Sequence, residues 1–192
     1  LGTSKYFSNE CIIIEYIKGY SLDNIINMKL NKDIKLKIIF QILVAFDYLH
    51  YKGFIYRDLK PNNIIFNDKG SITIIDFDRM IDNNDDQSTK NFCHKYIAPE
   101  FKSDKGFTAK SDIYSIGKII GFVFEEEFSH EFISEYSELH EIYENCINFD
   151  ETKRPNISDL VMSFYLTFIS KKINITDNEI IQSINNIESK NY

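Results

Sequence analysis

The segment from residue 63 to residue 76, NIIFNDKGSITIID, restricts the possible folds of this chain more than any other. Two isoleucine-rich runs stand on either side of residues 67–70, and asparagine and glycine in that stretch suit a tight turn with a positive-φ position. The pattern predicts a β-hairpin. Because hairpin strands are antiparallel, the residues that enter and leave it meet at the end opposite the turn. We therefore expect Asn63 and Asp76 to lie side by side.

The residues just before this hairpin read YRDLKPNN from Tyr56 and bring charged side chains to the same end. Amide and carboxylate oxygens suit Mg²⁺, which takes few protein ligands and keeps the rest of its shell for water and phosphate. Asn63 and Asp76 are therefore candidate metal ligands. Asp58 is available as a base, and Lys60 as a cation directed at phosphate. The alternative for Asp58, Asn63 and Asp76 is that they only cap turns and hairpin ends.

Helical patterns account for most of the remaining chain. Apolar residues recur at helical spacing from Asp33 to Leu49. Residues 112–128 are apolar on nearly every side and predict a buried helix, with Ser111 as its cap. Helical patterns continue from residue 134 to about residue 170, with a break at Arg154-Pro155. The predicted fold class is mainly α with a small β component.

Three shorter segments are predicted from local residue types. The β-branched run Cys11–Ile17 predicts a buried strand followed by a turn at Lys18-Gly19. Ser21 is the expected cap of a brief helix that begins LDNII. Residues 78–95 are polar and acidic without apolar periodicity, which predicts a loop.

Composition and charge narrow the functional classes. The net charge of −7 disfavours nucleic acid and anionic lipid as partners, because both would repel the chain. No apolar run approaches the roughly 18 to 20 residues of a membrane span, and the first residues do not resemble a signal peptide. Neither the three cysteines nor the four histidines have the spacing of a metal site. We expect the chain to work in a reducing compartment, the cytoplasm, with the nucleus as the alternative.

Five short motifs follow one another in the order and spacing of a known family: YRDLKPNN at 56–63, DFD at 76–78, APE at 98–100, SDIYSIG at 111–117 and RP at 154–155. Together they resemble the carboxy-terminal lobe of a eukaryotic-type protein kinase of the serine/threonine-directed subgroup, over roughly residues 5–165. The resemblance implies ATP and Mg²⁺ as cofactors and a protein substrate. On that resemblance, Asp58 accepts or orients the proton of the substrate hydroxyl, and Lys60 neutralises the charge of the transferring phosphoryl group. Asn63 and Asp76 would hold the metal ions.

The resemblance also implies a nucleotide-binding role for the segment IIIEYIKGYSL. This segment is similar to the strand and hinge that hold adenine. Ile14 takes the gatekeeper place, and the backbones of Glu15 and Ile17 face the purine edge. Ser21 falls near the ribose, and Ile65 would form the apolar floor. For Glu15 and Ile17 the alternative is an ordinary strand and turn.

Other matches are structural. Glu100 is expected to pair with Arg154, and breaking such a pair by removing one partner would be costly. Asp112 is expected to hydrogen-bond the backbone of the catalytic loop. Phe77 and Arg57 belong to the same structural set.

The activation segment contains Thr89, Cys93 and Tyr96. Thr89 matches the phosphosite of the family, and its phosphate would pair with Arg57. A solvated loop residue is the alternative for Thr89.

Four positions depart from the family pattern: Asp78 for glycine, Tyr56 for histidine, Phe92-Cys93 for Gly-Thr, and Tyr114 for tryptophan. Aspartate is among the residues that tolerate unusual backbone angles. The change at Phe92-Cys93 removes a hydroxyl that the family places near the catalytic aspartate.

The glycine-rich loop, strand lysine and helix glutamate of the family's amino-terminal lobe have no match in these 192 residues. We expect the chain to be cut from a longer polypeptide, with that lobe upstream. Residues 1–17 would be its last strands and hinge, 18–170 the helical lobe, and 171–192 a C-terminal extension. The expected function is a protein serine/threonine kinase in the parent protein, with little activity in this piece alone. A pseudokinase-like scaffold or peptide-binding module, and a truncated product without an independent role, are the alternatives.

Overall fold

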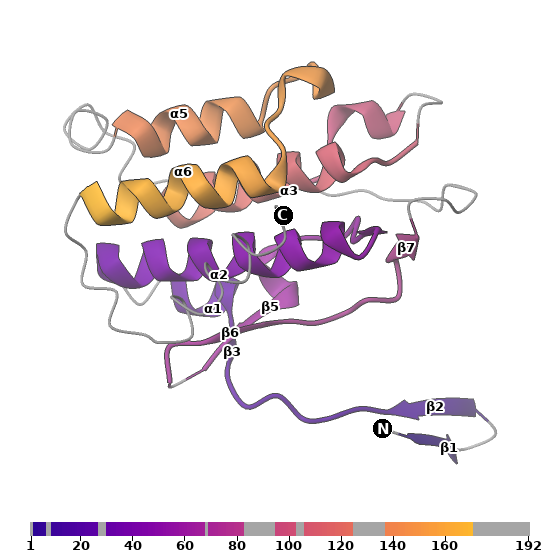
Figure 1. Ribbon diagram of the computed structural model, residues 1–192. Helices are drawn as coiled ribbons and strands as arrows, with labels where there is room; N and C mark the ends of the chain where they lie inside the picture. The colour runs from indigo at the N-terminus through magenta and orange to yellow at the C-terminus, as the bar shows by residue number, and fades with distance from the viewer. Residues whose placement is uncertain are drawn as a thin grey trace.

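The computed structural model describes residues 2–6, 9–26, 30–67, 69–82, 95–102, 106–124 and 137–170. Helices make up most of this part of the chain, and the strands form small antiparallel sheets (Figure 1). The predicted fold class, mainly α with a small β component, is confirmed. No helix among these residues is long and apolar enough to cross a membrane.

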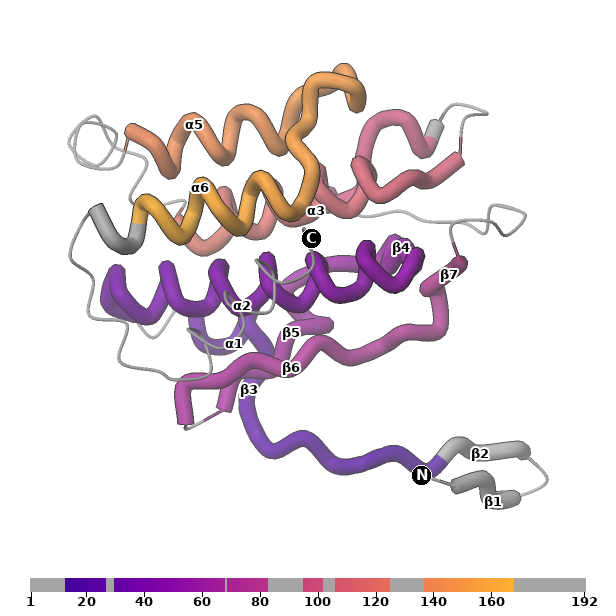
Figure 2. Tube along the Cα trace, viewed as in Figure 1, coloured from indigo at the N-terminus to yellow at the C-terminus, as the bar shows by residue number. Residues whose placement is uncertain are grey.

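Four helices form the body of the fold: α2 (Lys32–Tyr51), α3 (Ala109–Phe124), α5 (Ser137–Cys146) and α6 (Ile157–Ser170). α6 packs against α2, and α3 packs against both α2 and α5 (Figure 2). One continuous apolar core fills the space between them, and Phe46, Ile116 and Phe164 have no exposed surface there. Burial of each large apolar side chain contributes about 1.5–3 kcal/mol to folding.

The helix predicted from Asp33 to Leu49 is confirmed, and α2 extends it at both ends. Asn31 is its N-cap, because the Asn31 side-chain oxygen accepts a hydrogen bond from the Ile34 N–H at 2.9 Å. This bond satisfies one of the amides that the start of a helix leaves unpaired.

The predicted hairpin is also confirmed. β5 (Ile64–Phe66) and β6 (Ile72–Ile74) pair antiparallel. β3 (Tyr20–Ser21) pairs with the other edge of β5. Gly70 adopts φ +77°, the positive value that the turn was expected to need.

Gln41 of α2 attaches the turn of the hairpin to the helical body. The Gln41 side-chain amide donates to the Gly70 carbonyl at 3.0 Å, and its oxygen accepts from the Ile72 N–H at 3.1 Å. A single partly buried side chain therefore satisfies a donor and an acceptor of the hairpin backbone, which fixes the hairpin against α2.

The N-terminal strand prediction was wrong in its bounds and in its burial. β1 (Gly2–Tyr6) and β2 (Asn9–Ile13) form a two-stranded sheet that projects away from the helices in Figure 1. The strand thus ends at Ile13, and Ile14 is 69% exposed. β2 pairs only with β1 among the described residues, and Ile13 at its end is 55% exposed.

Ser21 stands at the predicted N-cap position, but its side chain does not make the predicted capping hydrogen bond. Ser21 precedes α1 (Leu22–Ile25) with an extended backbone, yet its side chain makes no hydrogen bond to the helix amides. The Ser21 hydroxyl oxygen instead accepts a hydrogen bond from the Asn24 side chain at 2.9 Å.

The loop prediction for residues 78–95 was wrong at its start. β7 (Ile81–Asp82) pairs antiparallel with β4 (Phe54–Ile55). A strand of two residues has no periodicity to read, and this pairing depends on a partner distant in sequence. Residues 83–94 lie outside the described part.

The cap predicted at Ser111 was wrong, because α3 begins at Ala109 and places Ser111 inside its first turn. Thr108 caps instead: the Thr108 hydroxyl oxygen accepts from the Lys110 N–H at 3.2 Å. Ser111 accepts from the Thr108 N–H at 3.1 Å and donates to Glu100 at 2.9 Å. Both residues are of the capping type, and only the fold decides between them.

The break predicted at Arg154-Pro155 is confirmed. A 3₁₀ helix, η4 (Glu151–Lys153), ends there, and α6 begins two residues after Pro155. Two further 3₁₀ helices, η2 (Pro61–Asn63) and η3 (Pro99–Lys102), lie beside the residues considered next.

Candidate active site

The loop that joins β4 to η2 is fixed by Asp112, which is buried on α3. The two carboxylate oxygens of Asp112 accept hydrogen bonds from the Tyr56 and Arg57 backbone N–H groups, each at 2.9 Å. His50 Nε2 lies 2.9 Å from the same carboxylate. Arg57 adopts φ +70°, a left-handed conformation that costs energy for a non-glycine residue. These bonds hold the loop in that conformation, and they are the backbone contacts expected of Asp112.

Asp58 is the centre of the site and has no exposed surface. Lys60 Nζ lies 2.7 Å from Asp58 Oδ2. The Asn63 side-chain nitrogen donates to the same oxygen at 3.2 Å and to the Asp58 carbonyl at 3.0 Å. Arg79 Nη1 lies 3.7 Å from the other carboxylate oxygen, Oδ1. A buried carboxylate needs such partners, since leaving it unpaired would cost several kcal/mol.

The open end of the hairpin joins this cluster. The Ile75 N–H donates to the Asn63 carbonyl at 3.0 Å, which continues the β5–β6 ladder and leaves Asp76 next along the chain. Partial desolvation raises the pKa of Asp76, and the neighbouring carboxyls of Asp78 and Asp58 raise it further, whereas Lys60 opposes them. The end of the hairpin and the preceding loop therefore place several carboxylates close enough to repel one another.

This donor set fits a divalent cation of the Mg²⁺ type. The two hydrogen bonds of the Asn63 side chain to Asp58 use its nitrogen, and the amide oxygen is the atom with which Asn63 would bind a cation. A cation beside Asp76 would relieve the repulsion between the carboxylates. No group of three or more His, Cys, Asp or Glu residues is arranged as a metal site among the described residues. Asn63 and Asp76 would supply two side-chain oxygens, and Mg²⁺ at phosphate sites takes few protein ligands.

Tyr56 ties the loop to the strand end, a role that its sequence position did not indicate. The Tyr56 hydroxyl donates to the Ile75 carbonyl at 2.5 Å, directly before Asp76. Its ring makes edge contacts with Phe46 and Phe77, whose ring centroids lie 5.6 and 5.4 Å away. Burial raises the pKa of Tyr56, so the hydroxyl stays protonated and acts as a donor at neutral pH. Phe77, one of the expected structural residues, contacts the Tyr56 ring, although Phe77 is 43% exposed.

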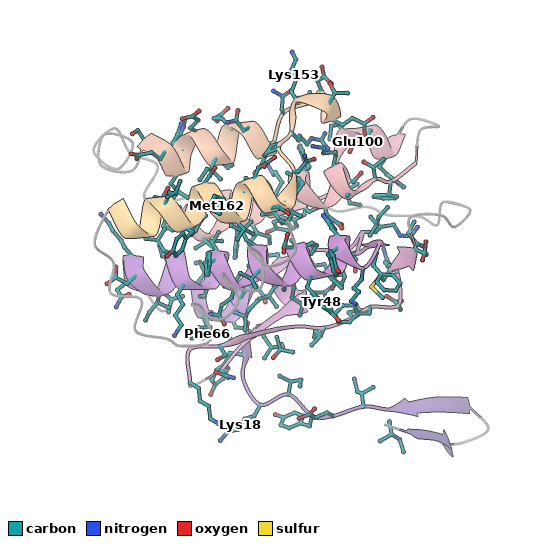
Figure 3. All side chains as sticks on the ribbon, viewed as in Figure 1. Lys18, Tyr48, Phe66, Glu100, Lys153 and Met162 are labelled. Atoms are coloured by element: carbon teal, nitrogen blue, oxygen red, sulfur yellow. The ribbon has the colours of Figure 1, made fainter. Side chains whose placement is uncertain are left out.

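Glu100 and Arg154 form the expected pair. Arg154 Nη1 and Nη2 donate to the two carboxylate oxygens of Glu100 at 2.6 and 2.7 Å. Figure 3 labels Glu100 and Lys153, which both lie in the upper part of the view. Burial alone would raise the pKa of Glu100, but the hydrogen bonds from Arg154 and Ser111 leave that pKa below its ordinary value. The Tyr114 ring lies against the Arg154 guanidinium at 5.0 Å, so the tyrosine at this position packs on the pair.

The residues assigned to the nucleotide fall into two groups. Ser21 and Ile65 stand opposite each other in the β3–β5 pair. Ile14 and Glu15 lie in the exposed connection between β2 and β3, and Ile17 is half-buried there. The structure thus brings Ser21 and Ile65 together on the sheet whose β5 directly follows Asn63, and leaves the other three on the connection.

Of the expected activation-segment residues, only Tyr96 can be placed. Tyr96 is buried, and its carbonyl accepts a hydrogen bond from the Ser115 hydroxyl on α3 at 2.8 Å. Thr89 and Cys93 lie outside the described residues.

Arg79 is the site residue that the sequence reading missed. It stands in the polar stretch that was taken as loop, directly after DFD, and no spacing links it to Asp58. The one available signal was its charge in an otherwise acidic run.

Comparison with known proteins gives the family of the chain. Residues 2–174 match the family model described as protein kinase domain. A probable serine/threonine-protein kinase of Dictyostelium discoideum is 27% identical over 190 residues, covering 88% of this chain and 19% of that protein. CBL-interacting serine/threonine-protein kinase 21 of Arabidopsis thaliana is 35% identical over 114 residues, covering 57% of this chain and 27% of that protein. The chain therefore spans less than a third of the length of these relatives.

Proposed function

The chain belongs to the protein kinase family, and from this premise we propose that it carries the catalytic loop of a protein serine/threonine kinase. The proposed reaction transfers the γ-phosphoryl group of ATP to a serine or threonine hydroxyl of a protein substrate. The observation that carries the proposal is the buried Asp58 held beside Lys60, at the end of a hairpin that also presents Asn63 and Asp76.

Each proposed role follows from where the side chain lies. Asp58 accepts a hydrogen bond from the acceptor hydroxyl and takes its proton as the oxygen bonds to phosphorus and the bond to the leaving oxygen breaks. Lys60 balances the charge of the transferring group. Asn63 and Asp76 would hold Mg²⁺, which supplies neutralisation of phosphate charge when bound. Catalysis of this kind is mainly positioning, so the fixed loop conformation at Arg57 contributes directly.

We also propose the division of the chain into residues 1–17 as the last strands of the amino-terminal lobe with the hinge, 18–170 as the helical lobe and 171–192 as an extension. Ile14, Glu15, Ile17, Ser21 and Ile65 would contact ATP. The 192 residues contain no glycine-rich phosphate loop, and we propose that they transfer little phosphate on their own. In the parent protein, phosphorylated Thr89 would pair with Arg57.

A pseudokinase-like scaffold is the second candidate function. It is favoured by the contact between Asp78, which replaces the family's glycine, and Asp76, whose pKa is raised by burial and by this neighbour. The hydrogen bond from Asp78 occupies a carboxylate that a cation would use, so Asp78 would compete with the cation for Asp76.

Phosphate incorporation into dephosphorylated casein and myelin basic protein by the full-length protein decides between the two functions. The kinase proposal expects transfer by the wild type and a loss of about 10²-fold or more in Asp58→Asn, because the proton acceptor is removed. Asp33→Asn, the same change at an exposed position on α2, is the matched control and should keep wild-type activity. Equal silence of all three proteins, with no thermal shift from Mg²⁺-ATP, would support the scaffold.

A further inference from the structure

Lys95 is an exposed residue directly before the buried Tyr96, and its side chain lies against aromatic rings. Lys95 Nζ lies 5.4 Å from the Tyr96 ring centroid and 5.7 Å from the Phe122 ring centroid. Among the residues that the structure describes, no carboxylate lies within ion-pair distance of this ammonium. An ammonium over an aromatic face keeps its charge and its N–H donors. Lys95 therefore presents a positive charge that the described part of the fold does not neutralise.

Two other cations near the site have an acidic partner in the fold, because Lys60 and Arg79 both lie beside the Asp58 carboxylate. The chain as a whole carries a net charge of −7 and repels acidic molecules at long range. An acidic partner is attracted only at short range, within roughly 8 Å of a cation whose charge is not cancelled. Lys95 is such a cation.

α3 holds Lys95 beside the loop that joins β4 to η2. Asp112 on α3 binds the backbone of that loop, and Ser115, three residues further along, donates its hydroxyl to the Tyr96 carbonyl at 2.8 Å. Phe122 follows Ser115 after seven residues. Residues three or seven apart lie on one face of a helix. The loop, Tyr96 and the Lys95 ammonium are therefore arranged along one face of α3.

The spacing on α3 gives the distance that a bound peptide would cover. A helix rises about 1.5 Å per residue, so the helix axis advances roughly 15 Å from Asp112 to Phe122. Lys95 Nζ lies at the Phe122 end, and Asp58 directly follows Arg57, whose amide Asp112 binds. An extended peptide covers roughly 15 Å in about four to five residues.

We propose that Lys95 binds an acidic side chain of the protein acceptor, about four to five residues from the hydroxyl that takes the phosphoryl group. This inference rests on the proposed kinase function, and it names acidic proteins as the substrate class. Lys95 touches no reacting atom and acts on specificity alone. Changing its charge should therefore change which acceptors bind and leave Mg²⁺-ATP binding unchanged.

The test measures the fluorescence anisotropy of two labelled peptides with the full-length protein. Both are alanine-based peptides with one serine, and they carry either glutamate or glutamine at the fourth and fifth residues on each side of it. The wild type should bind the glutamate peptide about threefold to fivefold more tightly, as expected for a partly exposed ion pair. Lys95→Met should lose this preference, Lys95→Arg should keep it, and Lys95→Glu should bind the glutamine peptide more tightly.

Lys52→Met is the matched control. Lys52 Nζ also lies over two rings, 5.6 Å from the Tyr48 centroid and 5.4 Å from the Tyr51 centroid, but it stands at the C-terminal end of α2. This variant should keep the wild-type preference. Equal affinity of the wild type for the two peptides would overturn the inference. A preference that persists in Lys95→Met would overturn it too, because a purely structural lysine affects both peptides equally.

Phosphate transfer to the serine of both peptides, followed in parallel, tests the function separately. Transfer by the wild type without any preference for the glutamate peptide would support the kinase function and overturn the role of Lys95. A preference that depends on Lys95, without transfer and without a thermal shift from Mg²⁺-ATP, would overturn the kinase function and support Lys95 as a site for acidic peptides.

Discussion

Replacing Arg154 by methionine should destabilise the chain by about 3–5 kcal/mol. The Arg154 side chain is fully buried and that of Glu100 is 8% exposed, so the change leaves a carboxylate that water reaches poorly and that has lost two hydrogen bonds of 2.6 and 2.7 Å. Breaking a buried pair by removing one partner typically costs this much. Arg154 also donates to the Asn148 and Lys110 carbonyls, and both acceptors lose that partner.

The measurement is the free energy of unfolding from urea denaturation at pH 7. Lys153→Met is the control, because the ion pair of Lys153 with Asp150 is long and exposed and should contribute less than about 1 kcal/mol. A loss below about 1 kcal/mol in Arg154→Met would refute the reasoning, since it would mean that Glu100 finds equal solvation without the arginine.

The same pair has a pH signature. Because the pKa of Glu100 is lowered in the folded chain, the stability it contributes is present above the ordinary glutamate pKa and disappears as the pH falls through the lowered value. The difference between wild type and Arg154→Met should therefore shrink as the pH falls below about 4.5. A difference in stability that stays constant down to pH 3 would contradict the conclusion that the Glu100 carboxylate is ionised in the pair.

Two further changes test the packing that positions the site. Gly117→Ala should lower the free energy of unfolding by about 1–3 kcal/mol, because the added Cβ would lie 2.6 Å from the Cys146 Cβ where α3 meets α5. The melting temperature should therefore fall. An unchanged melting temperature would show that the two helices can move apart at no cost. Gln41→Leu should lower the free energy of unfolding by a similar amount, because the Ile72 N–H and the Gly70 carbonyl lose their hydrogen bonds to α2. The hairpin amides should then exchange hydrogen faster than in the wild type. Wild-type protection of these amides would contradict the role of Gln41 in attaching the hairpin to α2.

The elements that the sequence predicted correctly are those with a local pattern. The hairpin was predictable because its turn residues and its two apolar runs are contiguous, and antiparallel pairing then places Asn63 near Asp76 without any knowledge of the rest of the chain. The long helix was predictable for the same reason, since its apolar spacing repeats over several turns.

Three of the failures concern contacts between distant segments. The β4–β7 pair places Ile55 opposite Ile81 and Phe54 opposite Asp82, which are 26 and 28 positions apart, and neither strand is long enough to show a period. Arg79 reaches Asp58 only because that pairing holds its segment beside the loop. Ser111 fits a cap equally well by composition, and it takes its actual role from Glu100. Distant partners, which a single sequence does not display, decided each of these cases.

The central claim is that Asp58 serves the chemical step while Asp76 serves the cation at the adjacent strand end. The most direct test measures Mg²⁺-dependent ATP affinity and single-turnover phosphate transfer on the full-length protein, for wild type, Asp58→Asn and Asp76→Asn. The account predicts that Asp58→Asn binds Mg²⁺-ATP like the wild type and loses transfer by about 10²-fold or more, whereas Asp76→Asn loses the Mg²⁺-dependent part of ATP affinity. Wild-type transfer rates in both variants would contradict it.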